Sequence, residues 1–253
     1  MSLANNNANH DPIASVYNAI GIASEAETIA LILEQLMLKY LSQGSHILDI
    51  GCANGQLVQQ FHIRGYQTTG LDCSEKLLHY AQINAPESKF ILSDIRKFES
   101  LPTYDAVFSR NTLGFILNLE ELTTVFRNVY AAMHNNGLFV FSIVTVDSVS
   151  RESLLEDFNI CDVTDKYVYL EEGKYNPEER IRQLKSTTFE LINGMWKRSD
   201  STVLDKAYFS SEIQSALENV GFIEINHYDS KDFGDPTPTG EDCFVCRKPS
   251  LTR

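Results

Sequence analysis

The chain has 253 residues, of which 43% are hydrophobic and 22% are charged, which is enough for one or two globular domains with a sizeable core. The formal charge is −13 and the basic residues are scattered, which argues against a nucleic-acid substrate because nucleic-acid binders usually carry a basic stripe. The sequence contains no long apolar run and no apolar signal segment in residues 1–10, so we expect a cytoplasmic protein that does not enter a membrane.

The five cysteines are odd in number and dispersed along the chain, unlike a disulfide framework. Cys243 and Cys246 stand three positions apart in a predicted strand, and such positions point to opposite faces of a sheet. We therefore expect neither a shared metal nor a disulfide at this pair, and no metal site elsewhere.

A helix is predicted over residues 24–41, because Ser24 and Glu27 have the spacing of a capping box and apolar residues recur on one face. This helix should pack on the sheet that follows. Together with the segment before it, which contains Tyr17, it makes up a predicted N-terminal arm and lid helix over residues 1–44.

Residues 45–56 predict a strand, a tight turn and a helix. Ile47, Leu48 and Ile50 form a short apolar run, and residues 51–55 break the pattern before apolar residues resume at helical spacing. Such a turn lets the backbone approach a ligand closely and points free N–H groups at it. Asp49, at the carboxyl end of the strand, can contact a cationic or hydroxylated ligand.

Two nucleotide-binding patterns compete for this turn. A dinucleotide fingerprint fails, because Ala53 and Gln56 stand where its second and third glycines belong. The pattern acidic-x-Gly-x-Gly-x-Gly is matched by Asp49, Gly51 and Gly55, with Ala53 in the place of the middle glycine. This stretch resembles motif I of the class I S-adenosylmethionine-dependent methyltransferases. An ordinary strand-turn-helix corner without a ligand is the alternative.

Strands and helices then alternate as in a doubly wound sheet, with strands over residues 66–71, 89–92 and 104–109 and a helix over 74–84. Asp72 closes the second strand, 21 residues after Gly51 (72 − 51). In a nucleotide-binding βαβ unit, an acidic residue at this position can accept hydrogen bonds from both ribose hydroxyls. Its alternative role is to cap the helix near Ser74.

The resemblance extends to the loop after the third strand. There the family has an acidic residue that accepts from the adenine amino group and an apolar residue that packs on the ring; Asp94 and Ile95 occupy these positions. The resemblance thus implies S-adenosylmethionine as cofactor. The residues implied to bind it are Asp49, Gly51, Cys52, Ala53, Asn54, Gly55, Asp72, Cys73, Asp94, Ile95 and Arg110.

The catalytic residues are not assigned by the sequence. The acceptor-side candidates are Tyr17, which resembles the aromatic lid residue of small-molecule methyltransferases, and Arg110 and Asn111, which follow the fourth strand at the ligand edge. Alternatively, Tyr17 pins a surface helix and Arg110 bridges helices. Among the histidines, only His10 is expected to approach the pocket. The chain lacks the Asn-Pro-Pro-Tyr signature, which disfavours the amino-methyltransferases that act on nucleobases and on protein amides.

After a helix beginning near Asn118, a turn at residues 134–137 and a fifth strand over 138–146, the alternation stops. Residues 148–209 predict strands at 167–170, 183–192 and 196–208, with a hairpin at Asn193-Gly194. Such an insertion cannot join the parallel sheet, so we expect an antiparallel cap over its carboxyl edge; similar insertions in the family build the acceptor pocket. Aromatic residues of the cap are candidates to line it, although alternation should turn half of them away: Tyr167, Tyr169, Tyr175, Phe189, Trp196 and Tyr208.

Residues 210–253 predict a helix over 211–220 and two strands, 222–228 and 242–247, that pair as a closing hairpin. The expected fold class is therefore α/β: a core over residues 45–147 and 210–253 with a seven-stranded, mostly parallel, doubly wound sheet whose last strand is antiparallel, plus a small antiparallel β cap inserted after strand 5.

The resemblance implies methyl transfer to a small-molecule acceptor by in-line displacement. Two alternatives stay open: a protein that binds S-adenosylmethionine without transferring its methyl group, and a nicotinamide-dependent oxidoreductase. The glycine spacing and the closing hairpin disfavour the oxidoreductase. The sequence specifies neither the acceptor, nor the methylated atom, nor the oligomeric state.

Overall fold

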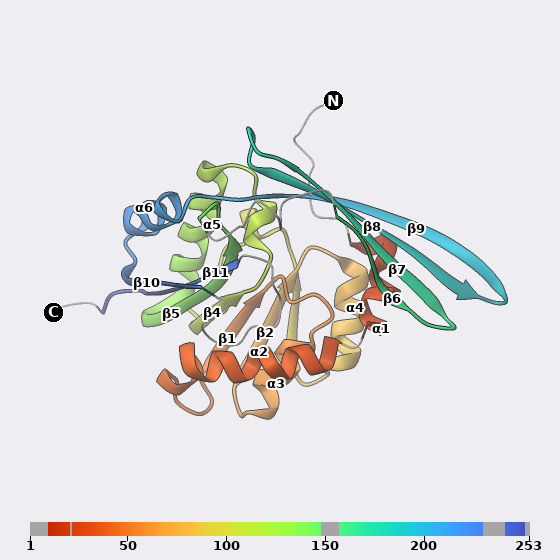
Figure 1. The fold of residues 1–253 in the computed structure, drawn as a ribbon. Helices are drawn as coiled ribbons and strands as arrows, with labels where there is room; N and C mark the ends of the chain where they lie inside the picture. The colour runs from red at the N-terminus through yellow and green to blue at the C-terminus, as the bar shows by residue number, and fades with distance from the viewer. Residues whose placement is uncertain (1–9, 21, 148–156, 230–240, 251–253) are drawn as a thin grey trace.

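The computed structural model describes residues 10–20, 22–147, 157–229 and 241–250 (Figure 1). Within these residues the chain forms a central sheet covered by helices on both faces, and a second, separate sheet.

The central sheet has seven strands in the order β10-β11-β5-β4-β1-β2-β3. The strands β1 to β4 are parallel to one another and to β5, whereas β11 is antiparallel to both of its neighbours, β5 and β10. This is the mostly parallel sheet with an antiparallel last strand that the sequence predicted. The strands are β1 His46–Ile50, β2 Gln67–Asp72, β3 Lys89–Leu92, β4 Tyr104–Ser109, β5 Met133–Val144, β10 Ile223–Asp229 and β11 Glu241–Arg247.

Helices cover both faces of this sheet because its central strands are apolar on both sides. Ile47 of β1 packs with α2 and α3, whereas Leu48 and Ile50 of the same strand pack with α5 and α6. Figure 1 shows α2 and α3 below the sheet and α5 and α6 above it. The helices are α2 Ile22–Leu36, α3 Gln56–Ile63, α4 Glu75–Asn84, α5 Leu119–Ala132 and α6 Ser210–Val220.

In the core, the predicted bounds of the first long helix and the start of the fifth strand are wrong. The first long helix begins at Ile22 and ends at Leu36, followed by a short 3-10 helix η2 (Leu38–Tyr40), so Ser24 lies inside the helix and is not its cap. The predicted turn at residues 134–137 belongs to β5, which begins at Met133 with an irregular register against β4. This segment extends the strand because it pairs with a distant part of the chain: the Asn136 N–H donates to the Lys248 carbonyl at 3.0 Å.

An N-terminal arm packs beside the turn after β1. The arm contains a 3-10 helix η1 (Asp11–Ile13) and a short helix α1 (Ala14–Ala19). The Oδ1 atom of Asn18 accepts from the side-chain amides of Asn54 at 3.1 Å and Asn84 at 2.9 Å, and the hydroxyl of Ser74 donates to Asp11. These contacts join the arm to the turn and to α4.

The cap is a four-stranded antiparallel sheet in the order β6-β7-β8-β9, as predicted for the insertion. Its strands are β6 Asp157–Val163, β7 Tyr167–Asn176, β8 Ile181–Ile192 and β9 Met195–Lys206. The sequence missed β6 and ended β7 too early, at residue 170. The hairpin at Asn193 and Gly194 is confirmed, with φ of 51° and 80°, and Figure 1 shows it extending well beyond the core.

Cys243 and Cys246 of β11 pack on opposite faces of the central sheet, the former with α2 and the latter with α5 and α6, and both are free thiols. The prediction that the two side chains point to opposite faces of the sheet is therefore confirmed. Among the helices that the structure describes, none is both long and apolar enough to span a membrane.

Candidate functional site

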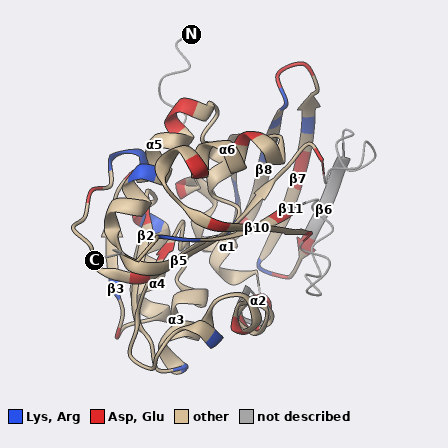
Figure 2. Ribbon diagram, turned by 90° about the vertical axis from the view of Figure 1, so that its left-hand side faces the viewer, with Lys and Arg blue, Asp and Glu red and all other residues tan. Residues whose placement is uncertain are grey.

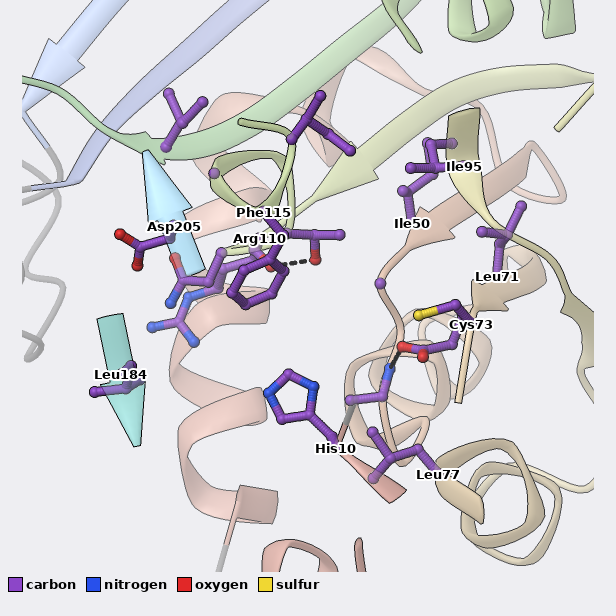
Figure 3. Close-up of a pocket in the computed structure, with 18 of the residues that line it drawn as sticks. His10, Ile50, Leu71, Cys73, Leu77, Ile95, Arg110, Phe115, Leu184 and Asp205 are labelled. Carbon is purple, nitrogen blue, oxygen red and sulfur yellow. Dashed lines mark hydrogen bonds between the residues drawn. The ribbon is translucent and has the colours of Figure 1, made fainter. Parts of the chain in front are cut away.

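A cavity of about 380 Å³ lies at the carboxyl edge of the central sheet, between the core, the arm and the cap. A smaller cavity of about 120 Å³ adjoins it around the turn after β1, and Tyr17, Gly51, Ala53, Arg110 and Asn111 line both. Figure 3 shows core residues such as Ile50, Leu71 and Ile95 on one side of the main cavity and Leu184 and Asp205 of the cap on the other, with His10 between them.

The structure brings nearly all of the predicted site residues to these two cavities. Of the predicted site residues, only Gly55 lines neither cavity. Those that line one or both cavities are Tyr17, Asp49, Gly51, Cys52, Ala53, Asn54, Asp72, Cys73, Asp94, Ile95, Arg110 and Asn111.

The turn after β1 has a left-handed backbone at alternate positions, with φ of 75° at Gly51, 47° at Ala53 and 75° at Gly55. A Cβ on Gly51 would lie 1.9 Å from the Thr112 hydroxyl oxygen, and one on Gly55 would lie 2.9 Å from the Cα of Ala81. The two glycines are thus required by the loop after β4 and by the packing of α3 against α4. Of these three residues, only Ala53 has a side chain, and a residue with a side chain rarely adopts the left-handed conformation.

Three N–H groups of this turn are not free, contrary to the expectation. Those of Gly51 and Cys52 donate to the Leu71 carbonyl at 2.7 and 3.1 Å, and that of Ala53 donates to Oδ2 of Asp72 at 2.9 Å. These hydrogen bonds fix the first half of the turn to β2.

Asp49, which lines the smaller cavity, is a candidate to bind a ligand. It is only 4% exposed, and among the described residues its carboxylate has no hydrogen-bond or ion-pair partner. Burial, and secondarily the charge of Asp72, raise its pKa from 3.8 to about 7. A buried carboxylate of this kind is stabilised by a cation. S-adenosylmethionine, which carries an ammonium and a sulfonium, fits this requirement.

Asp72 is buried at the end of β2 and lines the main cavity. Its Oδ2 accepts from Ala53 N–H, and its Oδ1 accepts from Ser74 N–H at 2.8 Å. Burial raises its pKa, although these two hydrogen bonds and the charge of His10 oppose that rise. The carboxylate thus ties the turn to the start of α4, where Ser74 is the N-cap, and still faces the cavity.

Asp94 is held by a neighbour that the sequence analysis missed. Arg96 donates to it through backbone N–H, Nε and Nη2, the last at 2.6 Å. Burial alone would raise the pKa of Asp94, but these hydrogen bonds outweigh it and the pKa is lowered. Arg96 lies in the short helix η3 (Ile95–Lys97) and also lines the cavity. Its position two residues after Asp94 could have suggested this ion pair from the sequence.

Arg110 bridges β4 to α2, because its Nη1 lies 2.8 Å from Oε1 of Glu25. This contact matches the helix-bridging alternative and leaves the residue on the wall of both cavities. The side chain of Asn111 accepts from the Ser142 hydroxyl at 3.1 Å, which links the same loop to β5.

Tyr17 and His10 bring the arm over the main cavity. The His10 ring lies 6.1 Å from the Tyr17 ring and 5.8 Å from that of Phe115, in the short helix η4 (Leu113–Phe115). Desolvation, followed by the charge of Glu25, raises the pKa of the Tyr17 hydroxyl to about 12. The phenol is therefore neutral at physiological pH.

The cap contributes one face of its sheet to the cavity. Of the six aromatic residues proposed for this wall, Tyr169 lines the cavity, whereas Phe189 packs under Arg198, Trp196 is 52% exposed and Tyr208 is fully buried in the core. Strand alternation turns some of these aromatic side chains away from the cavity, and Tyr208 lies where the chain has already returned to the core. The cap residues in the wall are Tyr169, Glu171, Arg182, Leu184, Ser186 and Asp205.

This chain is similar to known proteins in sequence and in fold. Residues 47–137 match the family model described as a methyltransferase domain. The YqeM protein of Bacillus subtilis (strain 168), named as a methyltransferase, is 23% identical over 207 residues that span 79% of this chain and 82% of YqeM. The dTDP-3-amino-3,4,6-trideoxy-alpha-D-glucopyranose N,N-dimethyltransferase of Streptomyces venezuelae is 27% identical over 119 residues, spanning 47% of this chain and 48% of that protein.

The fold is also that of a solved structure, an S-adenosylmethionine-dependent methyltransferase from Clostridium acetobutylicum ATCC 824. It aligns with a TM-score of 0.76 and 17% identity over 95% of this chain and 99% of that one. The fold and the ligand edge thus define an α/β protein of the class I methyltransferase type. The family-model match marks residues 47–137 as a methyltransferase domain, and together with the curated relatives and the fold it supports a class I S-adenosylmethionine-dependent methyltransferase with S-adenosylmethionine as cofactor.

Proposed function

We propose that this enzyme methylates a small-molecule acceptor held between the core and the cap. The observation that carries the proposal is the main cavity, which is lined at one end by the predicted donor residues and at the other by the inner face of the cap. Its volume of about 380 Å³ is in the range of small-molecule sites. The Streptomyces venezuelae relative bears the name of an enzyme for a sugar nucleotide, an acceptor of the same class.

The donor would occupy the end of the site that the core builds. Asp49 would neutralise a positive charge of S-adenosylmethionine in the smaller cavity, and Asp72 would accept from the ribose hydroxyls in the main one. Asp94 and Ile95, which both line the main cavity, would bind the adenine. When bound, S-adenosylmethionine supplies a methyl group on a sulfonium, which a nucleophile can displace in line.

The protein's own contribution is alignment and exclusion of water. Such a displacement gains most from holding the two reacting groups in line in a dry site. Tyr17, His10 and Phe115 close over the cavity from the arm and from η4. A neutral Tyr17 can orient an acceptor by hydrogen bonding, and a dedicated base is needed only if the nucleophile is protonated at working pH.

The donor site is tested by thermal unfolding with S-adenosylhomocysteine, with NAD as control. At about 100 times its dissociation constant, a ligand stabilises by roughly 2.7 kcal/mol, which corresponds to a shift of a few degrees in the unfolding temperature. We expect a shift with the adenosyl ligand alone. An equal shift with NAD would favour the oxidoreductase alternative, and no shift with either ligand would contradict the donor site.

Methyl transfer itself is tested by formation of S-adenosylhomocysteine from S-adenosylmethionine with added acceptors. Donor binding without turnover over a broad acceptor panel would favour the alternative of a binding protein without transferase activity.

A further inference from the structure

The cap presents a small set of polar side chains to the acceptor end of the main cavity. Strand pairing places them as direct cross-strand neighbours: Glu171 of β7 lies opposite Ser186 of β8, and Arg182 of β8 lies opposite Asp205 of β9. All four line the cavity. The charges at this end are therefore those of two carboxylates and one guanidinium.

The guanidinium is committed to one of these carboxylates. Arg182 donates through Nε at 3.1 Å and Nη2 at 2.5 Å to Oδ2 of Asp205, which is 8% exposed. The pair leaves Arg182 neutralised. An anionic acceptor would thus gain little from this arginine and would lie close to Glu171.

Glu171 is fixed by two hydroxyl groups from its own sheet. Its Oε1 accepts from the phenol of Tyr169 and, at 3.4 Å, from the hydroxyl of Ser186. Tyr169 is 9% exposed, so this part of the wall is both negative and largely shielded from water.

Glu171 also acts on another residue of the cavity wall. Desolvation raises the pKa of the Tyr17 hydroxyl most, the charges of Glu25, Asp72 and Glu171 raise it further, and that of Arg110 opposes them. Because charges interact more strongly away from bulk water, a group that becomes positively charged is favoured beside Glu171.

From this arrangement we propose that the acceptor is an amine and that Glu171, held by Tyr169 and Ser186, binds its nitrogen. This rests on the proposed function. The lone pair of a neutral amine forms the new N–C bond while the C–S bond of the donor breaks and its electron pair stays on sulfur. The positive charge thereby passes from sulfur to nitrogen, and the product ammonium then loses one proton to water. Glu171 stabilises the charge that appears on nitrogen in the transition state.

The alternative acceptors differ in charge. A carboxylate acceptor would bring a second anion beside Glu171, and a hydroxyl acceptor would have to lose its proton during the reaction. A neutral amine needs neither a cationic pocket nor a base at the moment of attack.

The test first establishes that S-adenosylhomocysteine binds, since failure at this step would contradict the proposed function itself. Turnover of S-adenosylmethionine is then measured with matched probes: glucosamine, glucose and glucuronate, and 2-aminocyclohexanol with 1,2-cyclohexanediol. We expect at least one amine to be methylated ten times faster than its hydroxyl or acid counterpart. A hydroxyl or acid probe that is faster than the amine, or the absence of any amine that exceeds the background, would overturn the proposal.

Two variants of adjacent residues test the role of Glu171. E171Q removes the charge with little change in shape and should lower kcat/KM for the amine at least tenfold, with the dissociation constant of S-adenosylhomocysteine unchanged within twofold. E172Q is the matched control, because Glu172 lies next in β7 and contacts Lys174 at 3.4 Å; it should leave both quantities unchanged. Equal effects of the two variants on kcat/KM would refute the assignment of Glu171.

Discussion

Asp49 and Gly51 stand two residues apart in the same motif, yet the structure gives them different reasons to be there. Gly51 is required by the protein itself, since Thr112 occupies the space that a side chain would need. The carboxylate of Asp49, by contrast, has no polar partner among the described residues, and burial raises its pKa. A buried carboxylate without a partner destabilises the fold, and such a residue is typical of a ligand site.

The Asp49→Asn variant should be more stable than the wild type in the absence of ligand, by on the order of 2 kcal/mol at pH 8. The folded-state pKa of about 7 exceeds the usual 3.8. Ionisation therefore destabilises the unliganded wild type progressively as the pH rises from about 4 to 7, and fully above that range. Denaturant unfolding at pH 4.5 and pH 8 measures the difference.

The Asp49→Asn variant should also bind S-adenosylhomocysteine more weakly, because the ammonium group of the ligand loses its charged partner. Glu87→Gln, at an exposed position, is the control. A variant that binds the ligand as tightly as the wild type would show that Asp49 is not part of the donor site.

Gly51→Ala should lose about 1–3 kcal/mol of stability, because a Cβ would meet the Thr112 hydroxyl oxygen at 1.9 Å and φ is 75°. Double-mutant analysis with Thr112→Gly separates the two causes. If steric contact dominates, the double variant should recover more than half of the loss in urea unfolding. Strictly additive losses would assign the effect to the left-handed backbone alone.

At the scale of elements, the arm is held by buried apolar residues, Ile13 and Val16, and by a few polar contacts. Among the polar contacts, Oδ1 of Asn18 accepts from both Asn54 and Asn84, and the arm carries Tyr17 and His10 to the cavity wall. The central sheet, by contrast, is held by continuous ladders and apolar faces.

Asn18→Ala should loosen the arm without melting the core, because two amides lose their shared acceptor, worth about 1–2 kcal/mol together. Hydrogen exchange in residues 11–19 should accelerate by about tenfold while exchange in β1 and β4 stays unchanged. Asn128→Ala, on α5 away from the arm, is the control. Equal protection of the arm in the variant and the wild type would contradict this role.

At the scale of the whole molecule, three layers of core carry a separate β cap at the carboxyl edge, and the site forms where the two meet. Figure 2 shows acidic and basic residues interspersed along the described elements, with no continuous basic stripe in that view. The net charge of −13 is thus a property of the whole surface. Excess charge of one sign destabilises the compact state by self-repulsion.

Salt should therefore stabilise the protein. Raising sodium chloride from about 10 mM to 0.2 M shortens the Debye length from roughly 30 Å to less than 10 Å, and the unfolding temperature at pH 8 should rise by a few degrees. The rise should disappear near the isoelectric point, where the net charge vanishes. A salt effect of the same size at both pH values would assign it to ion-specific binding instead.

The order of most elements could be predicted from the sequence because it depends on local signals. Apolar runs, the helix cap at Ser74 and the hairpin at Asn193-Gly194 are decided by residues close to one another in the chain. The ends of elements were less readable: β5 begins five residues before the predicted 138, at Met133, because it pairs with distant strands. Long-range pairing has no local signature.

For the site, the sequence alone predicted that the motif residues from Asp49 to Ile95 would lie near one another, because parallel strands bring their carboxyl ends to one edge of the sheet. The tertiary structure was needed to show that the N–H groups of Gly51, Cys52 and Ala53 are bonded within the chain, that Arg110 is paired with Glu25, and that Glu171 lines the cavity beside Tyr169. Each of these depends on a partner far away in the chain, and such a partner is chosen by the packing of the whole molecule.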